Sequence, residues 1–172
     1  IDRSNLTLVV ERDEGRVVVL DGTTMKELDR FWVGRIHGGP KFDQAWRRVW
    51  AVTRDGHVVA YDLGAGGVTA RVQAGINTRN IAVNAAGTLV AVAAQLPAHV
   101  ALLDGALKPL AVLPLKGQPS GVYQAPGEDH FVLTLRDAPT LLLIDQATFE
   151  VTERTLPEPF EDFVFVPGRR QL

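Results

Sequence analysis

The stretch Val58-Val59-Ala60-Tyr61-Asp62 is an apolar, strand-forming run that ends in an aspartate, and the chain contains four such runs. The other three are Val17-Val18-Val19-Leu20-Asp21, Val100-Ala101-Leu102-Leu103-Asp104 and Leu141-Leu142-Leu143-Ile144-Asp145. Successive aspartates are 41, 42 and 41 residues apart, which is too regular to arise by chance. A repeat of this length indicates that one supersecondary unit is stacked several times.

Each repeat unit contains further strand-forming runs around this stretch. A second β-rich run precedes it across a short turn, at residues 6–11, 49–53, 89–94 and 131–135. A more polar run follows it, at residues 27–33, 68–73, 111–115 and 150–155, and a less regular segment such as 80–83 supplies a fourth strand. Four short antiparallel strands in about 40–45 residues are typical of a propeller blade. Because no segment places apolar residues at the helical period, the sequence predicts an all-β fold with four β-propeller blades.

We treat residues 1–172 as a single β-propeller region. Its repeat units lie at about 1–34, 35–74, 75–116 and 117–157, and a next unit starts at 158–172. The chain opens on the second strand of a blade, and residues 160–166 have the pattern of a first strand. That last strand either pairs with the opening three strands and closes a four-bladed ring, or begins the second half of an eight-bladed propeller. Half a propeller would expose two sheet edges, so we expect a homodimer, pairing with a second half-propeller, or a closed ring.

Composition narrows the classes of function. The formal net charge is -2, so no excess of lysine and arginine is available for broad contact with nucleic-acid phosphates. No run of eighteen apolar residues is present, and the sequence predicts no membrane span. The absence of cysteine excludes iron–sulfur clusters, thiolate catalysis and a covalently attached c-type haem.

Six stretches of this chain are similar, in order and with near-constant separations, to a known family. They are Val9-Val10-Glu11-Arg12-Asp13-Glu14-Gly15-Arg16, Arg35-Ile36-His37, Thr53-Arg54-Asp55-Gly56, Thr78-Arg79-Asn80-Ile81, Ala93-Ala94-Gln95-Leu96-Pro97 and residues 131–145. Together they resemble the d1-haem β-propeller family, which includes the d1 domain of cytochrome cd1 nitrite reductase and the haem d1 biosynthesis proteins of the NirF type. The resemblance implies an eight-bladed propeller that holds a d1-type haem or its tetrapyrrole precursor on a central, positively charged face. It also implies a periplasmic location, and that this chain supplies blades one to four.

His37 lies in a loop that leads into the innermost strand of a blade, just before Gly38-Gly39-Pro40. Loops at that position open onto one face around the axis of a propeller. A neutral imidazole there can bind haem iron or exchange a proton with a tetrapyrrole. The plainer alternative is a loop histidine that is hydrogen-bonded to the backbone. In the similar family the corresponding histidine lies on the haem face, so the resemblance implies that His37 is a catalytic residue and a ligand of the haem iron.

Four arginines form a second group of candidates for cofactor binding: Arg12, Arg54, Arg79 and Arg136. Three of them recur just after the second strand of a blade, so the repeat predicts that they lie at one rim. Guanidinium groups bind carboxylates through paired hydrogen bonds, and a d1 haem carries several carboxylates. The alternative is that each of the three pairs with the aspartate that follows it. Arg79 precedes an inner strand, and the resemblance assigns it to ligand contact.

Gln95 is the last candidate for cofactor binding. It stands where the similar nitrite reductases have a tyrosine before a Trp-Pro step, and here the step is Leu96-Pro97. That departure removes one stacking or hydrogen-bonding group from the haem face. The other three histidines fall at no matching position and are interpreted as structural or exposed: His57, His99 and His130. The four repeated aspartates are interpreted as turn-formers, because aspartate side chains cap backbone amides.

Three functions stay open from the sequence. The first is binding of a d1-type haem or its precursor in haem d1 biosynthesis, since the opening Val9-Val10-Glu11-Arg12 is most similar to the NirF type. The second is a non-catalytic propeller that acts as an interaction scaffold, because fold does not determine function. The third is the d1 domain of a nitrite reductase, which the missing c-haem motif and Gln95 disfavour.

Overall fold

The computed structural model describes residues 5–166, which form fifteen strands in four antiparallel sheets. The first sheet has three strands, and the other three sheets have four strands each. The strands of the first and second sheets are β1 (Leu6–Glu11), β2 (Arg16–Asp21), β3 (Glu27–Trp32), β4 (Lys41–Phe42), β5 (Arg48–Val52), β6 (His57–Asp62) and β7 (Gly67–Gln73). Those of the third and fourth are β8 (Thr78–Val83), β9 (Leu89–Gln95), β10 (Ala98–Asp104), β11 (Pro109–Pro114), β12 (Pro119–Gln124), β13 (His130–Leu135), β14 (Thr140–Asp145) and β15 (Val151–Thr155).

The all-β prediction is confirmed, and the strands of the repeat lie within two residues of the ranges that the sequence predicts. Neighbouring strands in every sheet are consecutive in the chain, as in a propeller blade. The described residues contain no α-helix, and thus none that is long and apolar enough to cross a membrane.

The four repeated aspartates form turns, as the sequence predicts. Each accepts hydrogen bonds from backbone N–H groups two to four residues further on. The carboxylate thus closes the turn that follows β2, β6, β10 or β14. The aspartates are Asp21, Asp62, Asp104 and Asp145.

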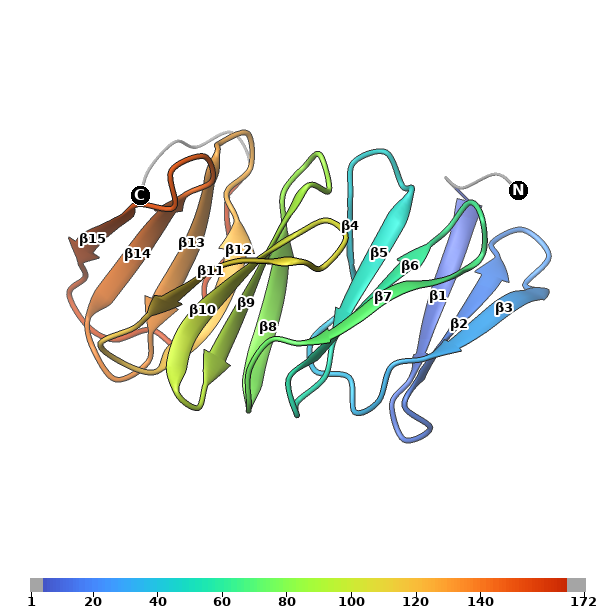
Figure 1. Ribbon diagram of the computed structural model, residues 1–172, viewed down its shortest axis with the longest axis horizontal. Helices are drawn as coiled ribbons and strands as arrows, with labels where there is room; N and C mark the ends of the chain where they lie inside the picture. The colour runs from blue at the N-terminus through green and yellow to red at the C-terminus, as the bar shows by residue number, and fades with distance from the viewer. Residues whose placement is uncertain (1–4, 167–172) are drawn as a thin grey trace.

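Figure 1 shows the four blades side by side in a row, with the first and the fourth blade at opposite ends. The core of the described residues lies between neighbouring blades. One cluster around Val49 joins the first and second blades, one around Trp50 joins the second and third, and one around Phe131 joins the third and fourth. The chain therefore does not adopt the closed four-bladed ring. It forms an open series of blades.

The strand β9 explains why the middle strands are apolar along their whole length. All seven of its residues are buried. Leu89, Ala91 and Ala93 face the fourth blade, whereas Val90 and Val92 face the second. Because successive side chains on a strand point to opposite faces, a blade that packs against a neighbour on each side needs an uninterrupted apolar run.

The described part of the expected next unit, residues 158–166, contains no strand, so the interpretation of 160–166 as a first strand is wrong for this chain. Phe163 and Phe165 instead pack against the outer flank of the fourth blade, beside Ala125, Val132 and Leu141. A strand needs a partner for its backbone groups, and no described strand lies beside this segment to provide one. Residues 167–172 of the expected unit lie outside the described residues.

Candidate functional site

One strand in each blade ends at the same rim of the row of blades. These strands are β1, β5, β9 and β13, and they are called the second strands because they precede the repeated apolar runs. Arg12, Arg54, Gln95 and Arg136 occupy equivalent positions there, 42, 41 and 41 residues apart. In three blades the backbone N–H of this residue donates to the loop that enters the same blade's inner strand. The acceptors are the carbonyls of Arg35 at 2.9 Å, Asn77 at 3.3 Å and Gln118 at 2.9 Å. The ends of the second strands and the loops that precede the inner strands therefore lie together at this rim.

His37 and Arg79 occupy a second set of equivalent positions at this rim. The pairings Thr78↔Ala94 and Pro119↔Leu135 place the starts of the inner strands β8 and β12 opposite the ends of β9 and β13. In the second blade the isolated bridge Ile36↔Thr53 places the loop before β4 in the same position, just after β5. The next residue in each blade is His37, Arg79 or Ser120. Arg79 lies where the register shifts between Thr78 and Asn80, so it is the extra residue of a β-bulge. Such bulges redirect a side chain away from the ladder.

The imidazole of His37 is half-buried and surrounded by positive charge. It lines an open hollow with Val10, Arg12, Ile36 and Gly38. Burial lowers the pKa of His37 below its ordinary value of 6.5, and the charges of Arg54, Arg79 and Arg12 lower that pKa further. The structure thus brings three of the predicted arginines around His37. The ring is neutral at pH 7 and keeps a nitrogen lone pair for a metal ion or a proton.

The arginines at the rim do not pair with the aspartates that follow them. The carboxylate of Asp55 accepts a hydrogen bond from Thr53 and lies 3.3 Å from Nδ1 of His57. Asp137 accepts the backbone N–H of Gln118 at 2.8 Å. Arg12 and Arg54 are exposed and form no ion pair with any residue of the range 5–166. Their guanidinium groups are therefore free to bind an anion.

Arg79 and Arg136 share a partner that the sequence motifs do not reveal. Both bind the carboxylate of Glu161, at 3.0 and 2.9 Å. The repeat contained a signal for this residue, because His37, Arg79, Ser120 and Glu161 are 42, 41 and 41 residues apart. Arg12, Arg54, Gln95 and Arg136 have the same spacing. Glu161 therefore occupies the position in the repeat that His37, Arg79 and Ser120 occupy in the preceding units.

Gln95 lies at the rim position of an arginine but turns into the protein. Its side chain is buried, its Oε1 accepts a hydrogen bond from Asn77 at 2.7 Å, and its Nε2 donates to the carbonyl of Pro119 at 3.3 Å. The amide thus links the third blade to the fourth. Contact of Gln95 with a cofactor stays a prediction.

The remaining histidines contact other groups: His57 begins β6, next to the turn that contains Arg54, and its Nδ1 lies 3.3 Å from Asp55. His99 is buried, with one ring nitrogen 2.7 Å from the carbonyl oxygen of Pro97 and the other 3.0 Å from that of Ala74. His130 begins β13, at the opposite end of its blade from Arg136, and lies 3.7 Å from Asp145.

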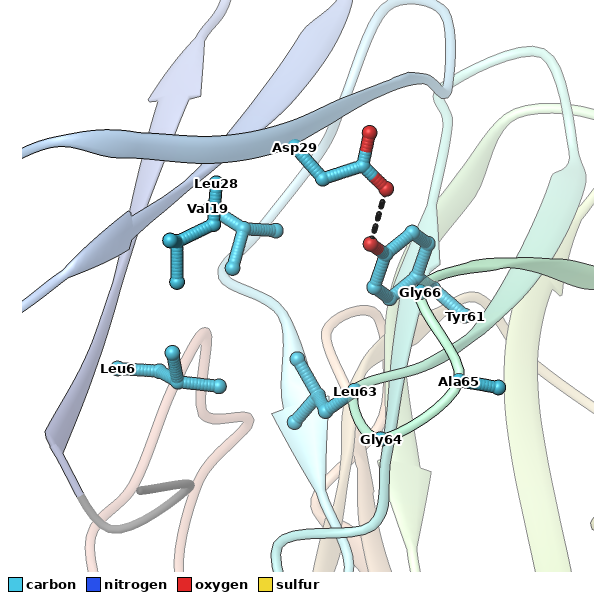
Figure 2. Close-up of a pocket in the computed structure, with 9 residues that line it drawn as sticks. All are labelled: Leu6, Val19, Leu28, Asp29, Tyr61, Leu63, Gly64, Ala65 and Gly66. Atoms are coloured by element: carbon cyan, nitrogen blue, oxygen red, sulfur yellow. Dashed lines mark hydrogen bonds between the residues drawn. The ribbon is translucent and has the colours of Figure 1, made fainter. Parts of the chain in front are cut away.

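A second hollow lies between the first two blades, at the end remote from Arg12, and its lining is mostly apolar (Figure 2). Figure 2 shows the hydroxyl of Tyr61 donating to the carboxylate of Asp29. Burial raises the pKa of Tyr61, and the bond to Asp29 raises it further. Neither arginine nor histidine lines this hollow, so it lacks the groups that bind carboxylates. The lining residues are Leu6, Val19, Leu28, Asp29, Tyr61, Leu63, Gly64, Ala65 and Gly66.

Comparison with known proteins identifies the family of this chain. The family model of the cytochrome d1 heme domain matches residues 1–172 of the chain. The chain belongs to the cytochrome d1 heme domain family. This match confirms the family resemblance that the sequence suggests.

Two curated relatives of this d1-domain chain come from Pseudomonas aeruginosa. The dihydro-heme d1 dehydrogenase is 38% identical over 182 residues, covering 99% of this chain and 37% of that protein. Protein NirF is 32% identical over 181 residues, covering 96% of this chain and 46% of that protein. The chain thus spans less than half the length of each of these relatives.

Solved structures give the same result for the fold. The dihydro-heme d1 dehydrogenase NirN, in complex with the ligand DHE, superposes with a TM-score of 0.92 and 36% identity, over 96% of this chain and 38% of that one. The hydrazine synthase of Kuenenia stuttgartiensis superposes with a TM-score of 0.73 and 14% identity, over 88% of this chain and 46% of that one. The second similarity is one of fold alone.

Proposed function

We propose that this chain binds a d1-type haem or its tetrapyrrole precursor at the rim of His37 and the arginines, in haem d1 biosynthesis. One observation carries the proposal: a half-buried, neutral imidazole lies among arginines, two of which have no carboxylate partner within residues 5–166. A macrocycle that offers both a metal or ring proton and peripheral carboxylates fits this combination of groups.

Each group has a separate part in the proposed site. The lone pair of His37 would hold the metal or accept a ring proton, since burial and then the surrounding positive charges lower the pKa of the ring and disfavour its protonation. Arg12 and Arg54 hold carboxylates by charge-assisted hydrogen bonds. When bound, a d1-type haem would supply a redox-active iron. The protein's contribution is to orient the macrocycle against the rim.

The relatives support a biosynthetic role. One is a dihydro-heme d1 dehydrogenase, and its structure was solved with a bound ligand. Because the chain spans 37% and 46% of the two relatives' lengths, we extend only tetrapyrrole binding to it, and we leave their complete activities to the whole proteins. A periplasmic location is part of this proposal. No feature of the rim favours the nitrite reductase domain or the inert scaffold over it.

Absorbance spectroscopy tests this proposal directly. Addition of d1 haem to the chain is expected to produce a Soret-type band that differs from that of free haem. His37→Ala is expected to shift this band, because the imidazole nitrogen is lost, whereas His130→Ala at the opposite end of its blade leaves the band unchanged. Absence of any spectral change at stoichiometric excess of haem would refute the proposed function.

A further inference from the structure

Glu161 is shared by two arginines of the rim that come from different blades. Its Oε1 lies 3.0 Å from Nη2 of Arg79, on β8, and its Oε2 lies 2.9 Å from Nη2 of Arg136, just after β13. Each carboxylate oxygen therefore contacts one guanidinium group. A carboxylate of the chain itself thus occupies one terminal nitrogen of each guanidinium group and offsets part of its positive charge, which weakens the attraction of this pair for a ligand's carboxylate.

Arg79 is also bound to the backbone. Its Nε–H donates to the carbonyl of Ser120 at 3.0 Å, and its side chain is only 20% exposed. Ser120 is the equivalent residue of the next blade, so Arg79 joins two inner strands. A turn of this guanidinium toward a ligand would remove a donor from that carbonyl and break the contact with Glu161.

Neighbouring side chains hold the segment around Glu161 in place. The hydroxyl of Tyr123 donates to Asp162 at 2.6 Å, and the ring of Phe163 meets the ring of Tyr123 edge-to-face at 4.8 Å. Burial and the bond to Asp162 raise the pKa of Tyr123 to about 12, so the hydroxyl keeps its proton and remains a donor at neutral pH. Glu161 is therefore fixed beside its two arginines.

The other half of the rim differs in charge. Arg12 and Arg54 are exposed, form no ion pair with residues 5–166, and act on His37 together with Arg79. The positive charge of Arg79 and Arg136 is partly balanced by Glu161, whereas that of Arg12 and Arg54 is not.

We propose that Glu161 decides where an acidic ligand docks: it holds Arg79 and Arg136 as fixed parts of the rim and leaves Arg12 and Arg54, beside His37, as the anchors for carboxylates. The identity of the ligand rests on the proposed function, whereas the division of the rim depends only on charges of the chain. Glu161 is thus a positioning residue, which favours ligands whose carboxylates lie on one side of the group that meets His37.

NMR of the arginine side-chain N–H groups tests this division without a tetrapyrrole. When citrate is added to the chain, the signals of Arg12 and Arg54 are expected to shift, and those of Arg79 and Arg136 to stay in place. In Glu161→Gln all four signals are expected to shift. Glu153→Gln is the matched control, because it removes an exposed carboxylate that pairs with Lys116 at 2.9 Å. Equal shifts of all four signals in the unaltered chain would overturn the proposal.

Fluorescence quenching of a carboxylated porphyrin gives the second measurement. Arg12→Ala and Arg54→Ala are each expected to weaken binding about tenfold, and Arg136→Ala less than about threefold. In the Glu161→Gln background, loss of Arg136 is expected to cost more than in the unaltered chain. Equal losses from all three arginine variants in the unaltered chain would contradict the division. A chain that shows the citrate pattern but binds no porphyrin would refute the proposed function while supporting the division.

Discussion

The protonation state of His37 follows from its surroundings. Burial lowers its pKa below 6.5, and the charges of Arg54, Arg79 and Arg12 add to that effect. As pH falls, the unfolded chain takes up the proton before the folded chain does. His37 therefore has no effect on stability above pH 6.5, and it destabilises the fold progressively as pH falls from 6.5 through its lowered pKa.

Removal of one charge is expected to change this pKa. In Arg54→Ala the pKa of His37 should rise toward 6.5, because one of the positive charges that oppose protonation is gone. NMR titration of the ring protons measures the change, and Arg154→Ala, which alters an exposed arginine on β15, is the control. An unchanged pKa in Arg54→Ala would mean that its guanidinium does not act on the imidazole.

At the scale of residues, the sequence predicts the rim but not the partners within it. Equal spacing along a repeat implies equal positions in space, which is why Arg12, Arg54 and Arg136 could be assigned to one rim. Gln95 has the same spacing, yet it points inward because its amide matches one donor and one acceptor across two blades. Glu161 was missed because its segment has the apolar alternation of a strand, which concealed the carboxylate's position in the repeat.

Among the strands, β5 carries the side chain with the largest expected effect on stability. Trp50 is fully buried between the second and third blades, and its indole N–H donates to the carbonyl of Gly105 at 3.3 Å. Trp50→Ala should lower the free energy of unfolding by about 3–5 kcal/mol, because it leaves a cavity and removes one of the two donors to that carbonyl, the other being Arg48 at 3.4 Å. Urea denaturation measures this change.

Trp46→Ala is the control for that measurement, because Trp46 is 48% exposed and belongs to the loop before the same strand. Its cost should be within about 1 kcal/mol. Similar losses of unfolding free energy from the two variants would contradict the assignment of Trp50 to the core between the blades. The sequence places Trp50 in a strand-forming run and Trp46 just before that run, but it does not give the exposure of either side chain.

The sequence predicts a strand well where the strand that pairs with it is adjacent in the chain. The hairpins β1–β2, β5–β6, β9–β10 and β13–β14 pair neighbouring segments, so local pattern and short turns determine them. Residues 160–166 have the pattern of a strand without a described strand beside them, and they remain irregular. Strand formation at that segment depends on a partner, which no local pattern can supply.

At the scale of the whole molecule, the open row of blades leaves two flanks of different character. Phe163 and Phe165 cover the flank of the fourth blade. On the first blade, Leu8 and Val10 pack toward the second blade, so Val9 between them points away from it and is 40% exposed. No described strand pairs with the free edge of β1. Exposed edges of this kind promote association between chains.

The 172-residue chain, purified alone, is therefore expected to form a dimer of 18.7 kDa subunits, which sedimentation velocity would detect. Val9→Lys should lower the fraction of dimer, because a charge on this flank would have to be desolvated in the contact. Val112→Lys alters an even more exposed valine, at 64%, on the outer strand β11, and it should leave the dimer intact if the first blade forms the interface. A monomer at every concentration, or equal effects of the two lysines, would show that this flank does not mediate self-association.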